Sequence, residues 1–180
     1  PTRRSSDLGL NRLDVARGEW TLFKADKKGR GKGPSDNDII TILADPANRA
    51  HLWLGTRDGG LNKLHLPTTT FSVFKPDPFP TADEISLGIT AMSFDPKGHL
   101  WLGTRDNMLW RFLPETGEFT PIEPLIAIAE QSMSQGNRTT VIQTLAIDKH
   151  GTLWAGTRMG IFSRNILEDD AGTWKQYTNN

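Results

Sequence analysis

The chain has 180 residues, of which 36% are hydrophobic, and its 21 basic and 21 acidic side chains give a formal net charge of zero. This balance is typical of a folded domain and excludes disordered, strongly acidic or strongly basic classes. No window approaches the roughly 18 consecutive apolar residues of a membrane helix, so we expect no membrane contact by this segment. The absence of cysteine excludes disulfides and thiolate metal sites, and it leaves both cytoplasm and periplasm open.

The first eight residues, Pro1 to Leu8, match the translated end of a common sequencing-library adaptor. A match of this length is improbable by chance. We therefore expect residues 1–8 to be an adaptor-derived scar, with the natural chain interrupted just before Gly9. Residues 9–24 then carry Gly-Leu-Asn-Arg-Leu followed by Trp20 and Phe23, a pattern that the rest of the chain repeats.

A pentad of the type Leu-Trp-x-Gly-Thr occurs three times, with its tryptophans 48 and 53 residues apart. A period of about 50 residues indicates a repeat architecture. The pentad positions are Trp53, Gly55, Thr56, Trp101, Gly103, Thr104, Trp154, Gly156 and Thr157. An apolar strand precedes each pentad and ends in an aspartate, which is Asp45, Asp95 or Asp148.

Each repeat predicts four short strands. The first carries apolar residues at matched positions, such as Ile39, Ile42 and Ala44, and we expect it to be buried on both faces as an innermost strand. Hairpin turns follow the pentads at residues 58–59, 106–107 and 159–160. The fourth strand carries an aromatic residue and, three positions later, another large apolar residue. The predicted units are 39–75, 89–124 and 141–178, and the connections are 25–38, 76–88 and 125–140.

Four hairpin-linked antiparallel strands in radial repetition predict an all-β protein, a β-propeller fragment with three complete four-stranded blades. Residues 9–24 repeat only the outer two strands and predict one half blade. A solenoid is the alternative, although common solenoid repeats are shorter or contain helices. Five tryptophans occupy repeat positions and are predicted to pack between blades: residues 20, 53, 101, 154 and 174. Because this open arc leaves apolar blade faces uncovered, we expect the isolated chain to aggregate or dimerise.

The pattern Asp-x-x-Gly-x-Leu-Trp-x-Gly-Thr, followed by Gly-Leu-Asn-Lys or Arg, closely resembles the two-component regulator propeller repeat. The resemblance runs from Gly9 to Tyr177. The first unit departs from it by two extra residues between Asp45 and Trp53. The second unit departs by Met108-Leu109-Trp110 in place of Gly-Leu-Asn.

This resemblance implies a ligand-sensing segment of a bacterial two-component receptor, the periplasmic sensor of a hybrid histidine kinase. Such propellers usually have seven blades, precede a transmembrane helix and a cytoplasmic output domain, and often sense oligosaccharides. The expected partners are an oligosaccharide, the remaining propeller blades of the same protein and, at full length, a second copy in a homodimer. The segment itself is expected to be non-catalytic, with no cofactor and no metal, and any kinase would lie elsewhere in the protein.

The candidate ligand-binding residues are Arg57, Arg105 and Arg158, which directly follow the Gly-Thr of the three units, together with Asp58 and Asp106 of the same turns. On one face of a propeller they would form an arc of guanidinium groups able to pair bidentately with carboxylate or sulfate. A uronic-acid or sulfated oligosaccharide would suit this arc. The alternative is that each arginine pairs with a neighbouring acid such as Asp58 or Asp106, or caps a blade carbonyl.

Other features favour structural roles. The recurring aspartates Asp45, Asp95 and Asp148 are expected to bond their own turns, and His51 and His99 share one strand position. No nucleophile and base can be paired from the sequence.

The three connections differ in composition, which fits individual recognition, dimer contacts or solvated connectors. The basic connection, residues 25–38, lacks the interleaved aromatic residues of a nucleic-acid site, so we expect no nucleic-acid partner. The alternative functions are a propeller enzyme, a lyase or glycan-active hydrolase with its site in other blades, and a protein-interaction propeller.

Overall fold

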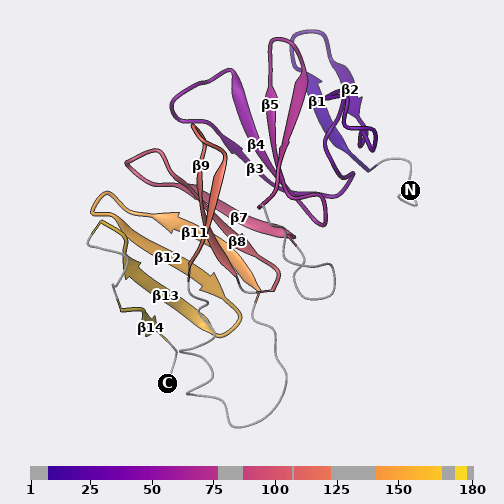
Figure 1. The fold of residues 1–180 in the computed structure, drawn as a ribbon. Coiled ribbons are helices and arrows are strands. Elements are labelled where there is room, and N and C mark those ends of the chain that lie inside the picture. The colour runs from indigo at the N-terminus through magenta and orange to yellow at the C-terminus, as the bar shows by residue number, and fades with distance from the viewer. Residues whose placement is uncertain (1–7, 77–86, 107, 123–140, 168–172, 178–180) are drawn as a thin grey trace.

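The structure, a computed structural model, describes residues 8–76, 87–106, 108–122, 141–167 and 173–177 (Figure 1). These residues form strands, turns and loops only, and none of them belongs to a helix that could cross a membrane. Residues 1–7 of the adaptor-like stretch 1–8 lie outside this part of the chain, as do residues 77–86 of the connection 76–88, the whole connection 125–140 and turn residue 107.

The strands form three four-stranded antiparallel sheets and one two-stranded sheet, which confirms the predicted fold class. The half blade contains β1 (Leu10–Asp14) and β2 (Glu19–Phe23). Blade one contains β3 (Ile39–Ala44), β4 (His51–Thr56), β5 (Leu61–His65) and β6 (Thr70–Phe74). Blade two contains β7 (Ile89–Phe94), β8 (Leu100–Thr104), β9 (Leu109–Leu113) and β10 (Glu118–Ile122). Blade three contains β11 (Ile142–Ile147), β12 (Thr152–Thr157), β13 (Gly160–Asn165) and β14 (Lys175–Tyr177).

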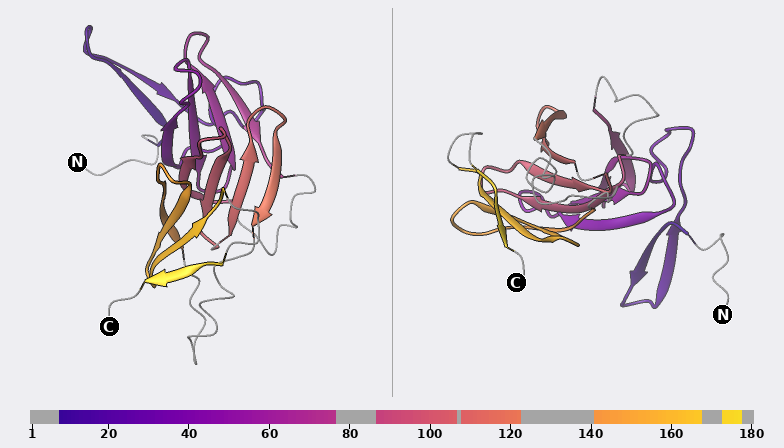
Figure 2. Two further views of the ribbon diagram at one scale, coloured as in Figure 1. Left: turned by 90° about the vertical axis from the view of Figure 1, so that its left-hand side faces the viewer. Right: turned by 90° about the horizontal axis from the view of Figure 1, so that it is seen from below.

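The blades stand side by side as an open fan, with the half blade at one end and blade three at the other (Figure 2). The first strands β3, β7 and β11 contact one another in that order, so they form the inner edge of the fan. Each of them carries a bulge at the same place, after Ile39, Ile89 and Ile142. A bulge bends its strand and raises the local twist, which suits a strand at the crowded centre of a propeller.

The apolar core consists of three clusters, each lying between neighbouring blades. The spacing of three between the aromatic and apolar residues of each fourth strand follows from this, because residues three apart in a strand face opposite sides. Phe71 packs toward the half blade, with its ring centroid 5.6 Å from that of Phe23. Phe74 packs toward blade two, with its ring centroid 5.3 Å from that of Phe112.

The prediction that every innermost strand is buried on both faces is wrong for β3, and it is also wrong for β11, where Thr144 and Ala146 are exposed. Ile42 is 52% exposed, whereas Met92 and Leu145, at the same position in the next two blades, are each 8% exposed. The inner strands of the preceding blade cover Met92 and Leu145. No such strand covers Ile42 in the described part of the chain, because the half blade there consists of β1 and β2 alone.

Candidate functional site

The aspartate at the end of each innermost strand shapes the turn that follows. In blade two, Asp95 Oδ1 accepts the backbone N–H groups of Lys97 and His99, each at 2.9 Å. Asp45 and Asp148 accept two turn N–H groups in the same way. The expected turn role of these aspartates matches their hydrogen bonds.

The second carboxylate oxygen of each aspartate accepts a hydrogen bond from the tryptophan of the pentad, which sequence reasoning missed. The distance from indole Nε1 to Oδ2 is 3.1 Å in all three blades, for Asp45–Trp53, Asp95–Trp101 and Asp148–Trp154. The sequence signal that could have predicted this bond was the recurrence of Asp and Trp at a nearly constant separation. The two extra residues of blade one, between Asp45 and Trp53, leave this bond intact.

Hydrogen bonding of this kind makes the third blade sensitive to acid. The backbone N–H of Thr152 and then the Trp154 indole lower the pKa of Asp148 from 3.8 to about 2. Because the folded-state pKa lies below the unfolded value, the stability from this carboxylate is present above about pH 4 and is lost between about pH 4 and pH 2. We expect Asp148→Asn to flatten that part of the pH profile of unfolding, followed by tryptophan fluorescence. An unchanged acid limb in the variant would contradict this role.

The threonine of each pentad closes the hairpin turn that carries the candidate arginine. Thr56 Oγ1 donates to the carbonyl of Gly60 at 2.8 Å, and Thr104 Oγ1 donates to the carbonyl of Met108 at 3.0 Å. Blade two therefore keeps the closure of blade one although Met108 replaces glycine. In blade three Thr157 Oγ1 donates to Gly160, so this turn is one residue shorter.

The glycine of the pentad is required by the close approach of the next blade. A Cβ atom at Gly103 would lie 2.5 Å from Ile142 Cγ2, and one at Gly55 would lie 2.7 Å from Ile89 Cγ2 and 2.6 Å from Thr41 Cγ2 of its own blade. Both isoleucines belong to the innermost strand of the following blade. At Gly156 the near atom is Thr144 Cγ2 of its own blade, at 2.6 Å.

The tryptophans at repeat positions differ in burial according to their neighbours. Trp53 and Trp101 are buried against the following blade, as predicted. Trp154 is half-buried. The prediction is wrong for Trp20 of the half blade, which is 68% exposed and belongs to none of the three core clusters. Trp174 contributes to the cluster between blades two and three.

Arg57, Arg105 and Arg158 follow β4, β8 and β12, the second strand of each blade, and so lie at the same end of the blades. Arg57 forms an ion pair through Nε with Asp38, a residue of the preceding connection. This hydrogen bond and the charge of Asp38 raise the pKa of the Arg57 guanidinium. The partner in the ion pair is thus Asp38 rather than the neighbouring Asp58, whose N–H donates to Asp36 Oδ2 at 3.1 Å.

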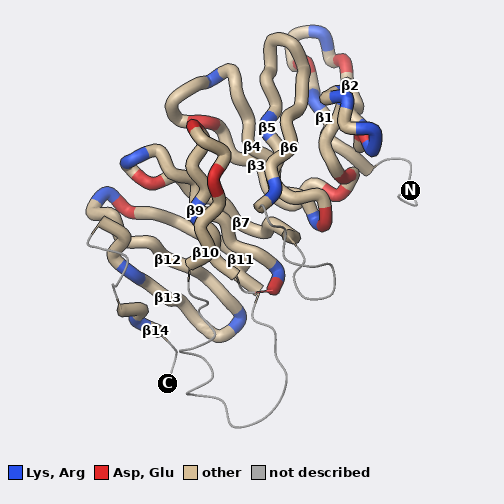
Figure 3. Tube along the Cα trace, in the orientation of Figure 1, with Lys and Arg blue, Asp and Glu red and all other residues tan. Residues whose placement is uncertain are grey.

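The side chains of Arg105 and Arg158 are exposed, and neither has an ion-pair or hydrogen-bond partner among the described residues. Asp106 forms no ion pair with Arg105 among the described residues, and its Oδ1 lies within hydrogen-bond distance of the Thr104 hydroxyl. The Arg105 backbone N–H donates to the Gly88 carbonyl at 3.0 Å, which fixes the turn to the connection that enters blade two. Basic and acidic positions recur along the turns at both ends of the blades (Figure 3).

Asn62, from the Gly-Leu-Asn opening of blade one, holds the connection between the half blade and blade one. Its Oδ1 accepts the Ser35 N–H and its Nδ2 donates to Ser35 Oγ, both at 2.8 Å. Blade two has Trp110 at this position, packed in the core between blades one and two. At this position blade one therefore has a side chain that hydrogen-bonds a connection, and blade two has a side chain that packs in the apolar core.

The basic connection, residues 25–38, is held in place by hydrogen bonds. The Asp26 carboxylate accepts backbone N–H groups from Lys28, Arg30 and Lys32 at 2.8–3.2 Å. The carbonyl of Gly31 accepts the Phe71 N–H at 2.9 Å, which ties the loop to blade one.

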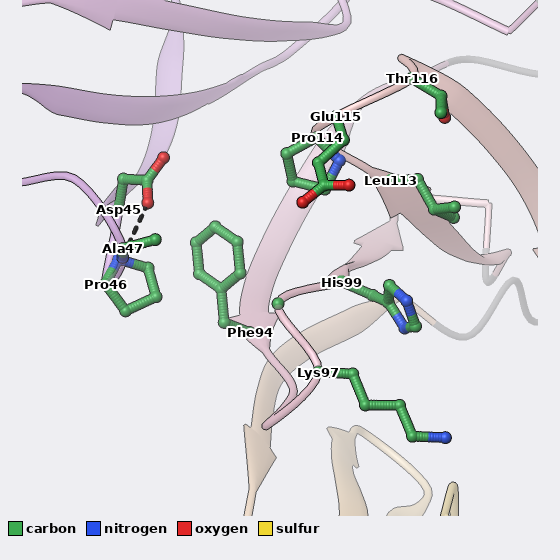
Figure 4. Close-up of a pocket in the computed structure, with 11 residues that line it drawn as sticks. Asp45, Pro46, Ala47, Phe94, Lys97, His99, Leu113, Pro114, Glu115 and Thr116 are labelled. Atoms are coloured by element: carbon green, nitrogen blue, oxygen red, sulfur yellow. Dashed lines mark hydrogen bonds between the residues drawn. The ribbon is translucent and has the colours of Figure 1, made fainter.

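A pocket of about 310 Å³ lies between blades one and two, at the opposite end of the strands from the candidate arginines. Phe94 stands between Pro46 of blade one and Leu113 of blade two, and Lys97 and Glu115 supply opposite charges at its rim (Figure 4). A concave, mostly apolar site with a few polar groups suits a small organic ligand. Sequence reasoning missed this pocket because its walls come from turns of two different blades.

The histidines show no metal centre. His99 Nδ1 lies 3.0 Å from Asp95 Oδ2, and the rings of His51 and His65 lie 5.1 Å apart across β4 and β5. Burial, followed by the charges of Lys63 and His65, lowers the pKa of His51. In the described residues, no three His, Cys, Asp or Glu side chains are placed to hold a metal ion.

Comparison with known proteins agrees with this geometry. The model of the two component regulator propeller family matches residues 83–106, and no curated protein matches the chain. The extracellular domain of BT4673 from B. thetaiotaomicron is similar in two crystal structures, described as part of a one component system in one and of a hybrid two component system in the other. Each gives a TM-score of 0.72 at 21% identity over 97% of this chain.

The chain covers 20% of that extracellular domain, so it spans about a fifth of its length. The WD40 repeats of RRP9 are similar at a TM-score of 0.55 and 13% identity, over 76% of this chain and 37% of theirs. WD40 repeats form propeller blades of four strands. This chain is therefore a β-propeller segment in which residues 83–106 match the two component regulator propeller family.

Proposed function

We propose that this chain is a non-catalytic, ligand-sensing segment of a periplasmic receptor domain in a two-component system. Its proposed ligand is an oligosaccharide that carries carboxylate or sulfate groups. The observation that carries the proposal is the pair Arg105 and Arg158, two exposed guanidinium groups at equivalent positions of adjacent blades. Neither has a side-chain partner among the described residues.

The chemistry of the pair limits the ligand class. A guanidinium group recognises carboxylate or sulfate through two parallel hydrogen bonds, which a neutral sugar cannot match. One exposed ion pair contributes at most about 1 kcal/mol, so recognition requires both arginines and an extended ligand. Arg57 contributes less to ligand binding, because its guanidinium group already forms an ion pair with Asp38.

Binding of an oligogalacturonide to the full chain, measured by calorimetry at low salt, tests the ligand class. We expect Arg105→Ala together with Arg158→Ala to weaken binding about tenfold, as expected for two lost exposed charge pairs. Asp38→Asn releases Arg57 and should strengthen binding. The matched control is Arg49→Ala, an exposed arginine in the β3–β4 turn at the other end of the blade. Equal binding of a neutral oligosaccharide of the same length would contradict the proposal.

The receptor assignment is tested separately by the uninterrupted gene. A downstream membrane helix and a kinase-type domain would support it. A stop codon directly after a lone propeller would contradict it and favour a propeller enzyme.

The pocket between blades one and two carries a second candidate, the binding of a small neutral ligand. The apolar walls at Phe94 and Leu113 favour this class over an anionic sugar. Phe94→Ala would abolish such binding and leave oligogalacturonide binding unchanged.

A further inference from the structure

Blade one carries two histidines that face each other across neighbouring strands. His51 begins β4 and His65 ends β5, and the two are register partners in the antiparallel ladder, with ring centroids 5.1 Å apart. Partners of this kind have Cβ atoms about 5 Å apart on one face of the sheet. Blade three has Thr152 opposite Asn165, and blade two has Leu113 at the position of His65. Among the described blades, the histidine pair is therefore specific to blade one.

The longer turn of blade one separates His51 from the aspartate that its counterpart contacts. In blade two, His99 Nδ1 lies 3.0 Å from Oδ2 of Asp95, four residues earlier. In blade one, Asp45 lies six residues before His51, whose Nδ1 is buried without a hydrogen-bond partner in the described part of the chain. Buried polar atoms in folded proteins nearly always have a partner, which an ion or a water supplies where the protein does not. The unpaired nitrogen therefore indicates an ion or a water bound at this place.

The second histidine already has the kind of hydrogen bond that orients a metal ligand. His65 Nδ1 lies 2.7 Å from Thr68 Oγ1, which in turn lies 2.8 Å from Thr70 Oγ1. With the proton on Nδ1, the imidazole donates to Thr68, and the Thr68 hydroxyl donates onward to Thr70. Histidines that bind metals almost always donate one ring N–H to an oxygen in this way. The lone pair of His65 Nε2 is then available to an ion.

A neutral imidazole is the form that binds a metal, and the surroundings of His51 favour it. Burial, followed by the charges of Lys63 and His65, lowers the pKa of His51, so its ring is uncharged at neutral pH. Lys63 also repels a bound cation. Its Nζ, however, lies 4.0 Å from Oδ2 of Asp45, whose carboxylate offsets part of this charge.

We propose that His51 and His65 together bind one divalent transition-metal ion of the kind that imidazole prefers, such as Zn²⁺. With Zn–N bonds of about 2.0 Å, the centroids of two imidazoles at a tetrahedral ion lie about 5 Å apart. The separation of 5.1 Å matches this geometry. Two histidines are not a complete metal centre, so water fills the remaining positions. The site lies at the opposite end of β4 from Arg57 and is therefore separate from the candidate arginines.

Calorimetric titration of the full chain with ZnCl₂, in a buffer that binds no metal, tests this site. We expect one ion per chain. The variants His65→Leu and His51→Thr should each bind Zn²⁺ at least tenfold more weakly, because the second imidazole on a rigid sheet acts at a high effective concentration. These substitutions copy Leu113 of blade two and Thr152 of blade three, so both variants should melt close to the parent chain when no metal is added.

The melting midpoint gives a second measurement. Zn²⁺ should raise the midpoint of the parent chain and leave those of both variants unchanged, because an ion that binds only the folded chain stabilises it. The matched control is His150→Ala, an exposed histidine outside the pair, which should bind Zn²⁺ as the parent does.

Three results would overturn the proposal. The first is a parent chain that binds no Zn²⁺ at millimolar concentration, and the second is equal affinity of His65→Leu and the parent. The third is loss of binding in His150→Ala or a zinc-dependent dimer in sedimentation, because the ion would then lie elsewhere or between two chains.

Discussion

Replacement of Trp53 with alanine is expected to lower the free energy of unfolding by about 3–5 kcal/mol, as for other large buried aromatic residues. Trp53 is fully buried, and its ring centroid lies 5.5 Å from that of Phe112 in the next blade and 5.7 Å from that of Phe74. Its indole N–H also donates a hydrogen bond to Asp45 Oδ2. Because a domain has only about 5–15 kcal/mol of total stability, the loss should lower the melting midpoint by roughly 10 °C.

The matched control is Trp154→Ala, at the same position of blade three. Trp154 makes the same hydrogen bond to aspartate but is half-buried, with Tyr177 of its own blade as a ring neighbour at 5.7 Å. The loss of stability should therefore be markedly smaller. Chemical denaturation of both variants measures the difference. Equal destabilisation would mean that packing against the next blade contributes little and that the hydrogen bond dominates.

Gly103→Ala is expected to destabilise the chain by about 1–3 kcal/mol although it adds one methyl group to a strand. The added Cβ would lie 2.5 Å from Ile142 Cγ2, and Ile142 is fully buried with a stiff, β-branched side chain. Relief of this overlap requires blades two and three to move apart. Thermal unfolding, together with exchange of the β11 amides, should report looser packing between these blades.

Gly156→Ala provides the comparison for this prediction. Its Cβ would meet only Thr144 Cγ2, on a side chain that is exposed and can rotate away. We expect little change in stability. A loss as large as that of Gly103→Ala would show that the requirement for glycine lies within a blade and not between blades.

The sequence predicted the strand order and number of strands in each unit because alternation and recurring turn residues are local signals. It also predicted the turn role of Asp95, since the bonded N–H groups lie two and four residues away. The exposure of Ile42 could not be read from the same pattern. That exposure depends on what covers the residue, and nothing in residues 39–44 records it.

For the candidate arginines, the sequence predicted the position in each repeat and did not predict the ion-pair partner. Their repeated position after Gly-Thr was visible in the sequence, but the partner of Arg57 was not. Asp38 lies 19 residues earlier, in a connection of unique composition. The pocket at Phe94 was equally invisible, because residues of two blades form its walls.

The hydrogen bond between the aspartate carboxylate and the tryptophan indole keeps the same length when the loop between the two residues is longer. In blade one the tryptophan follows the aspartate after eight residues, whereas the separation is six in the other two blades, yet Asp45 and Trp53 meet at the same 3.1 Å. Each blade can therefore accept a longer or altered loop at this place while its sheet keeps its register. The rim of the propeller can diversify by insertion, blade by blade, on a scaffold that stays constant.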